Sequence, residues 1–179
     1  MAIGLVGSEM CIRDSVFNRA RLIKNSKNRI PYGVDLIQKY KRESWIVFTE
    51  NKKQANEFNK IINTKGFKSA LYNTDLDSTE RLENLNKFKK ADLNVLVTCT
   101  ALDEGFDMPE ADGALILSAS SSKRQRVQRM GRVLRITENK PNALIVTVYS
   151  SKTEFDKLME EAKRYHKEGV PVSWKRQDR

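Results

Sequence analysis

The stretch WIVFTENKKQANEFNKIINTKGFKSALY, residues 45–72, decides the fold. It begins with an apolar run at 45–49, continues through a polar segment of helical period at 52–63, and ends with a second apolar run at 69–72. Short apolar runs joined through a helix are typical of parallel strands buried on both faces. The stretch therefore predicts an α/β protein.

The same alternation continues along the chain. Further strands are expected at 94–98, 114–118 and 143–149, and further helices at about 34–41, 78–90, 122–135 and 152–167. Ser78 is expected to cap its helix, and Gly66 and Gly113 are expected in short connections. These elements predict a single domain with a parallel sheet covered by helices on both faces.

The ends of the chain differ from its middle. Residues 1–15, MAIGLVGSEMCIRDS, follow no periodic pattern and resemble translated adapter or vector sequence, so we expect a disordered or non-native leader. Residues 16–44 are expected to be a basic lead-in with one helix, 45–167 the folded domain, and 168–179 a basic tail.

Charge and cysteine content restrict the function. A formal charge of +10 and a pI near 9.6 predict attraction to polyanions, nucleic acid above all, although most of the dispersed Lys and Arg residues are expected to be merely solvated. Cys11 and Cys99 form no CxxC pair, which argues against a disulfide framework or a zinc site and favours a reducing, cytoplasmic setting. The apolar runs are strand-sized, so no membrane role is expected.

The stretch RQRVQRMGRVLR, residues 124–135, holds five arginines. On a helix, Gln128, Arg132 and Arg135 fall within about 60° of one another, opposite an apolar stripe. Two guanidinium groups one turn apart suit a phosphate, because each offers a planar fork of donors and keeps its charge. A basic helix that lies on a nucleic-acid backbone or in water is an equal alternative.

A second candidate site is NVLVTCTALDEGFDMPEAD, residues 94–112, which begins with a buried strand. Hydroxyl groups of Thr98 and Thr100 and loop amides at the end of a strand can hold a phosphate, and Asp107 could bind a ribose hydroxyl. An acidic turn without a ligand is the alternative.

These residues resemble the motifs of superfamily 2 helicases and translocases. QRMGRVLR resembles motif VI, TALDEGFDMP motif V and WIVFTEN motif IV, in the family's order, and the likeness covers about residues 16–165. Within the superfamily the chain is most similar to XPB-like DNA helicases. The resemblance implies the second of two RecA-like domains that bind ATP between them. Because no glycine is followed by lysine, the chain has no GxxxxGK phosphate loop. We therefore expect a fragment whose missing N-terminal RecA-like domain holds most of the Mg²⁺ site.

The resemblance also implies roles for single residues. Arg132 and Arg135 would reach the γ-phosphate and share the role of arginine finger, and Gln128 would couple nucleotide to nucleic acid. Asp107 would contact the ATP ribose, and Gly105 would allow the loop to approach the nucleotide closely. Where many relatives have a phosphate-binding threonine, this chain has Cys99. Nucleic-acid backbone contacts are expected from Thr49, Glu50, Thr98, Thr100, Lys123 and Arg124.

The leading interpretation is the second motor domain of an ATP-dependent DNA helicase or translocase, inactive as an ATPase by itself. An RNA helicase domain is one alternative, because no feature of the sequence reads a 2′-hydroxyl. A standalone basic nucleic-acid-binding module is the other, and in that case the arginines would contribute to binding like any other basic residue.

Overall fold

The computed structural model describes residues 28–99, 111–117, 144–167 and 171–173. The expected leader at 1–15 and the expected arginine-rich helix at 122–135 lie outside these residues.

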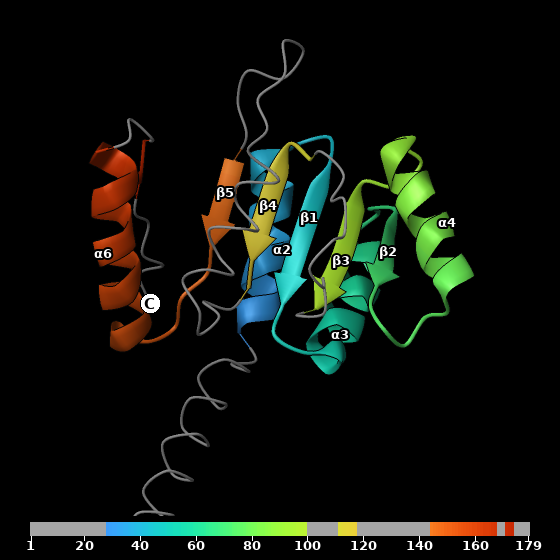
Figure 1. Cartoon of the computed structure of the whole chain (residues 1–179), viewed down its shortest axis with the longest axis horizontal. Coiled ribbons are helices and arrows are strands. Elements are labelled where there is room, and N and C mark those ends of the chain that lie inside the picture. Colours follow the sequence, from blue (N-terminus) through green and yellow to red (C-terminus); the bar gives the residue numbers. More distant parts are fainter. Residues whose placement is uncertain (1–27, 100–110, 118–143, 168–170, 174–179) are drawn as a thin grey trace, which may run out of the picture.

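The described residues form one sheet of five strands (Figure 1). The strands are β1 (Trp45–Thr49), β2 (Ser69–Tyr72), β3 (Val95–Cys99), β4 (Gly113–Ile116) and β5 (Leu144–Thr147). Their order across the sheet is β2-β3-β1-β4-β5, and all four described pairings are parallel. The predicted α/β fold with a parallel sheet is confirmed.

Four described helices accompany the sheet: α2 (Arg29–Tyr40), α3 (Lys52–Thr64), α4 (Ser78–Lys89) and α6 (Lys152–Lys167). Alternate side chains of β1 enter two cores on opposite faces. Trp45 and Val47 pack with residues of α2 and α3, while Ile46 and Phe48 join a second cluster with residues of α4. The apolar runs are thus buried on both faces, as the sequence predicts.

Helix α2 begins at Arg29, whereas the sequence predicted a start at Val34. Pro31 and Gly33 interrupt the helical pattern there. Pro31 lies in the first turn, where the missing N–H would have no helical partner, so the helix tolerates it. Gly33 allows close packing, because a Cβ at this position would come within 2.5 Å of Leu117 Cδ2. Both residues are therefore compatible with the helix.

The predicted cap of α4 is also wrong by one residue. Asp77 is the N-cap, and its Oδ1 accepts a hydrogen bond of 2.7 Å from the backbone N–H of Glu80. Ser78 is the first helical residue. Both residue types favour N-caps, and the sequence pattern does not decide between neighbours.

Gly66 follows α3 with φ of +88° and occupies a connection as predicted, but Gly113 does not. Gly113 is the first residue of β4 and pairs with Trp45 across the sheet. The indole of Trp45, which is fully buried, covers the position where a Cβ would stand. The missing side chain of Gly113 therefore provides the space for the indole.

Candidate functional site

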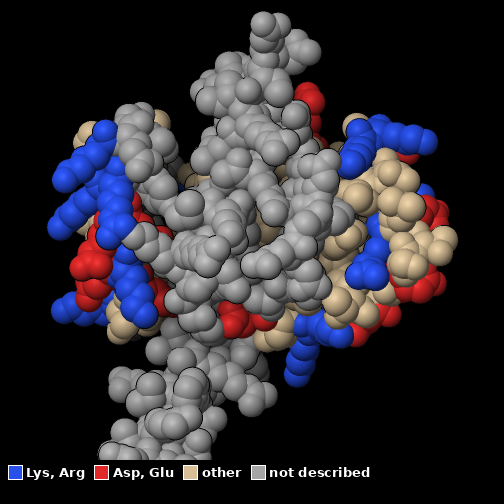
Figure 2. All heavy atoms as spheres, in the orientation of Figure 1, with Lys and Arg blue, Asp and Glu red and all other residues tan. Residues whose placement is uncertain are grey.

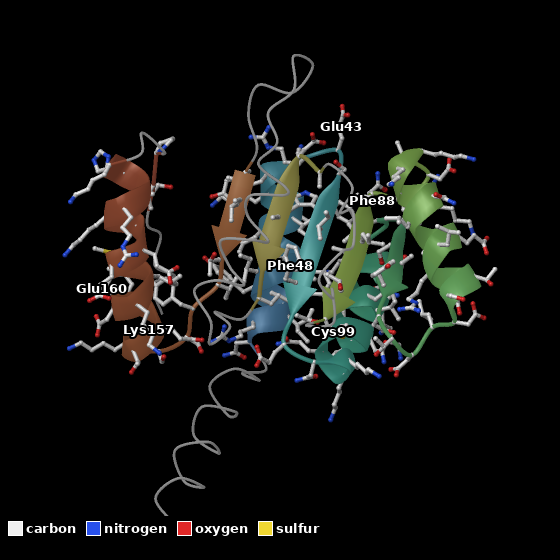
Figure 3. All side chains as sticks on the ribbon, in the orientation of Figure 1. Glu43, Phe48, Phe88, Cys99, Lys157 and Glu160 are labelled. Atoms are coloured by element: carbon white, nitrogen blue, oxygen red, sulfur yellow. The ribbon has the colours of Figure 1, made fainter. Side chains whose placement is uncertain are left out.

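The carboxyl ends of the strands lie along one edge of the sheet, where ligands of open α/β sheets bind (Figure 1). β1 and β3 are neighbours, and their register places Thr49 opposite Cys99. Figure 3 shows Cys99 at this carboxyl edge and Glu43 at the opposite, amino edge. The connections that carry the stretches resembling motifs IV and V therefore begin side by side.

Thr49 and Thr98 are candidate site residues that the structure brings into direct contact. Thr49 Oγ1 donates to the backbone oxygen of Thr98 at 3.0 Å, and the Asn51 carbonyl oxygen lies 3.3 Å away. Thr98 Oγ1 donates to the backbone oxygen of Cys99 at 3.1 Å. Thr49 is 2% exposed and Thr98 1% exposed, so both hydroxyls serve the fold. Their contact with nucleic acid stays a prediction.

Glu50, the third described candidate, lies in the turn between β1 and α3. Its backbone N–H donates to Gln54 Oε1 at 2.9 Å, and Asn51 Oδ1 accepts from the backbone N–H of Gln54, also at 2.9 Å. Asn51 is thereby the N-cap of α3. The two side chains fix the conformation of the turn and leave the half-buried Glu50 at the carboxyl edge.

The neighbouring connection, between β2 and α4, joins this turn through an exposed ion pair of Lys52 with Asp75. Asn73, which is 3% exposed, accepts a hydrogen bond of 3.0 Å from the backbone N–H of Asp75. Burial raises the pKa of the Tyr72 phenol at the end of β2, and the charge of Arg81 opposes this shift. The carboxyl edge around β1 and β2 is thus built from paired groups.

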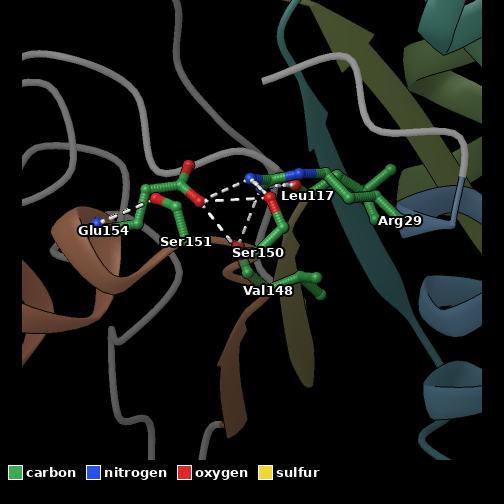
Figure 4. Close-up of polar contacts among 6 residues, drawn as sticks. All are labelled: Arg29, Leu117, Val148, Ser150, Ser151 and Glu154. Carbon is green, nitrogen blue, oxygen red and sulfur yellow. Dashed lines mark hydrogen bonds and ion pairs between the residues drawn. The ribbon is translucent and has the colours of Figure 1, made fainter. Parts of the chain in front are cut away.

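Arg29, which lies in none of the motif-like stretches, organises the other end of the carboxyl edge (Figure 4). Its Nη1 donates to the carbonyl oxygens of Leu117 at 2.7 Å and Val148 at 3.1 Å, directly beyond β4 and β5. Its Nη2 donates to Ser150 Oγ at 2.6 Å and to Glu154 Oε2 at 2.5 Å. One buried guanidinium therefore joins α2, β4, β5 and α6.

Glu154 holds this guanidinium from the first turn of α6. Its Oε2 also accepts from the backbone N–H of Ser150 at 2.9 Å, and its own N–H donates to Ser151 Oγ at 3.2 Å. A carboxylate in the first turn is favoured by the helix dipole. The serine three residues before a glutamate is a sequence signal for this cap, but no signal in the sequence connects Glu154 to Arg29, which lies 125 positions away.

The remaining candidate site residues lie outside the described residues: Thr100, Gly105, Asp107, Lys123, Arg124, Gln128, Arg132 and Arg135. Within the described ranges, no group of three His, Cys, Asp or Glu side chains could hold a metal ion. The hydroxyls of Thr49 and Thr98 are engaged in the fold, and Lys52 is paired with Asp75. None of the helices in the described ranges has the length and apolar character needed to cross a membrane.

Comparison with known protein families identifies the family to which this domain belongs. Residues 28–137 match the family described as helicase conserved C-terminal domain. The chain belongs to this family and is a C-terminal RecA-like domain of the superfamily 2 type. The resemblance drawn from three motifs is thereby confirmed.

Individual relatives agree with this assignment. The chain is 36% identical over 129 residues to the DNA 3'-5' translocase XPB2 of Sulfurisphaera tokodaii, an alignment that covers 72% of this chain and 28% of that protein. It is 24% identical over 144 residues to the ATP-dependent rRNA helicase RRP3 of Scheffersomyces stipitis, with 80% and 30% covered. The chain thus spans less than a third of the length of these relatives.

A solved structure shows the same fold. The C-terminal domain of the DEAD-box protein Dbp5 superposes with a TM-score of 0.69 at 22% identity, covering 81% of this chain and 82% of that one. At 22% identity, this similarity supports the fold alone.

Proposed function

We propose that this chain is the second motor domain of an ATP-dependent superfamily 2 DNA translocase or helicase that works on nucleic acid inside the cell. The observation that carries the proposal is the contact at the carboxyl edge, where Thr49 Oγ1 donates to the Thr98 carbonyl oxygen at 3.0 Å. It joins the stretches that resemble motifs IV and V. The 36% identity to a DNA translocase supports DNA as the substrate.

The proposal assigns the residues of this chain to two tasks. Thr100, Lys123 and Arg124 would hold the nucleic-acid backbone, a type of contact that carries no sequence preference. The buried Thr49 and the acidic Glu50 would position the edge beside them. Arg132 and Arg135, by their place in QRMGRVLR, would approach the phosphates of ATP bound with Mg²⁺ against the first motor domain. Bound ATP supplies the phosphoryl group whose transfer to water drives the motor, and arginine fingers contribute on the order of 10³ to 10⁵ in rate to such transfers.

The test uses the protein from the whole reading frame that includes this domain. ATP turnover would be measured with and without duplex DNA for the parent and for an Arg132→Ala, Arg135→Ala double variant. The matched control, Lys163→Ala with Arg164→Ala, removes the same charge from exposed positions on α6. We expect DNA-stimulated turnover to fall at least about 10³-fold in the arginine variant and to persist in the control, because only the former would stabilise the transferring phosphate.

DNA affinity, measured on the same proteins, separates the proposal from a standalone binding module. A motor predicts that both variants bind DNA about equally. Loss of affinity in the arginine variant with unchanged turnover would refute the motor assignment. Stimulation by matched RNA instead of DNA would keep the motor and correct its substrate, an outcome that the likeness to an rRNA helicase makes worth measuring.

A further inference from the structure

Three connections that the structure describes meet at the amino edge of the sheet, opposite the candidate site. Residues 41–44 lead into β1, 65–68 into β2 and 90–94 into β3. The Asn94 N–H donates to the Lys68 carbonyl oxygen at 2.8 Å, and the Trp45 N–H donates to the Asn94 carbonyl oxygen at 2.8 Å. Together with the last residues of the helices before them, at 39–40 and 89, these connections form a continuous strip, here named the amino-edge rim.

The amino-edge rim is strongly basic. Its exposed basic residues are Lys39, Lys41, Arg42, Lys65, Lys68, Lys89 and Lys90. Among the described residues, the acids along this edge are Glu43, Asp92 and Asp112, so seven positive charges less three negative charges leave a formal +4. Lys87 is left out because it pairs with Glu83 at 2.6 Å. Figure 2 shows basic side chains gathered around the end of α4, at the upper right.

The described part of the carboxyl edge carries no such excess. The basic residues in its connections and first helical turns are Arg29, Lys52, Lys53, Arg81 and Lys152, and the acids are Glu50, Asp75, Asp77, Glu80 and Glu154. These five positive and five negative charges cancel. The positive charge of the described residues is therefore concentrated at the edge that lies away from the candidate site.

Helix dipoles account for only part of this charge. α2, α3 and α4 all end at the amino edge, where lysines offset the partial negative charge of a helix carboxyl end. Each end contributes about −0.5 charge, so the three helices together contribute about −1.5. Against a formal +4 the amino-edge rim stays positive, and it attracts polyanions.

Lys41 gives a second, independent indication. It ends α2 in the left-handed conformation, with φ of 40° and ψ of 50°, and its N–H donates to the Ile37 carbonyl oxygen. Glycine is the usual residue at such a helix end, because a Cβ makes this conformation unfavourable. A lysine here places an exposed charge on the amino-edge rim at a conformational cost that glycine would avoid.

We infer that the amino-edge rim binds the phosphate backbone of nucleic acid, as a contact separate from the carboxyl edge. The nature of the ligand rests on the proposed function. Neighbouring strands lie about 4.8 Å apart, so the starts of β2, β3 and β1 span roughly 10 Å. One strand of duplex DNA carries a phosphate about every 3.4 Å of its axis. The amino-edge rim therefore covers the axial rise of about three phosphates of one strand.

The test compares two triple variants of the 179-residue chain. The rim variant carries Arg42→Gln, Lys68→Gln and Lys90→Gln. The control carries Lys157→Gln, Lys163→Gln and Arg164→Gln on exposed positions of α6 and loses the same charge. Binding to a fluorescent 20-base-pair DNA duplex would be followed by anisotropy between about 50 and 300 mM salt, and circular dichroism would confirm that both variants are folded.

Three lost phosphate contacts reduce the slope of log K against log salt by about 2.7, and the affinity at 0.1 M salt by on the order of 10²-fold. We expect this in the rim variant and a slope change below about one in the control. Equal losses in both variants would overturn the inference, since net charge alone would explain them. An unchanged slope in the rim variant would also overturn it and leave an acidic protein as the partner to seek.

The binding test of the amino-edge rim and the test of the proposed function can fail independently. The first measures DNA affinity of the chain, and the second measures ATP turnover of the whole protein. A rim variant of that protein with weakened DNA binding and normal turnover at saturating DNA would support the inference. A rim variant whose turnover is lost even at saturating DNA would contradict it, because the amino-edge rim would then serve the motor site.

Discussion

Replacing Gly113 with alanine tests how closely β4 approaches the buried indole of Trp45. A Cβ at this position would stand 2.5 Å from Cε3 and 2.7 Å from Cδ2 and Cζ3 of the ring, about 1 Å inside ordinary contact. The ring is fully buried, so either the ring or β4 must shift. Overpacking of this kind costs up to about 3 kcal/mol, and the reduced freedom of the unfolded chain returns about 0.7 kcal/mol. The expected net destabilisation is about 2 kcal/mol, or roughly 4–8 °C in the melting temperature.

Urea unfolding followed by circular dichroism would measure this loss, and a double-mutant cycle would assign it. Trp45→Leu makes room for the added methyl group, so we expect Gly113→Ala to cost at least about 1 kcal/mol less in that background. Gly66→Ala is the control, because its φ of +88° disfavours alanine although no atom lies within 4 Å. Its cost should be the same with either residue at 45. A loss below about 0.5 kcal/mol for Gly113→Ala, or additive effects of the two substitutions, would refute the steric reasoning.

Four further substitutions probe other contacts of the fold, each by urea unfolding. Arg29→Met leaves the carboxylate of Glu154 buried without its partner and should cost about 3–5 kcal/mol, and a cost below about 1 kcal/mol would contradict the buried pairing. Asp77→Ala should cost about 1 kcal/mol as a lost helix cap, whereas Ser78→Ala should change stability by less than half of that. Lys41→Gly should stabilise the fold by about 0.5–1 kcal/mol while it weakens binding to DNA, and loss of stability would show that the left-handed lysine is not strained.

Much of the fold could be predicted because it depends on local patterns. The apolar runs at 45–49 and 69–72 became β1 and β2 with the predicted bounds, and helix 152–167 became α6. Errors occurred where the local pattern fits two neighbouring residues equally, as at Asp77 and Ser78, or where a residue's effect depends on its place in the fold. Pro31 and Gly33 disfavour a helix interior, but Pro31 lies in the first turn of α2 and Gly33 packs against Leu117.

The candidate site, like the fold, could be predicted from the sequence only in part. The order and spacing of the motif-like stretches led to the helicase family, which the comparisons confirm. The sequence could not reveal that the hydroxyls of Thr49 and Thr98 donate hydrogen bonds to backbone carbonyl oxygens. The bond of Thr49 depends on the pairing of β1 with β3. It also could not reveal Arg29, because two of its partners are carbonyl oxygens that every residue type provides and the other two, Ser150 and Glu154, lie more than 100 positions away.

The guanidinium of Arg29 has a consequence for biosynthesis. Its carboxylate partner, Glu154, is made 125 residues later, which at 5–20 residues per second is roughly 6–25 s of translation. Until then, a positive charge destined for the interior has no counter-ion, and the ends of β4 and β5 have no clamp. The native arrangement can therefore form only after the beginning of α6 has left the ribosome. A nascent chain stalled before Glu154 should remain sensitive to protease at α2, and one stalled well beyond α6 should be protected there.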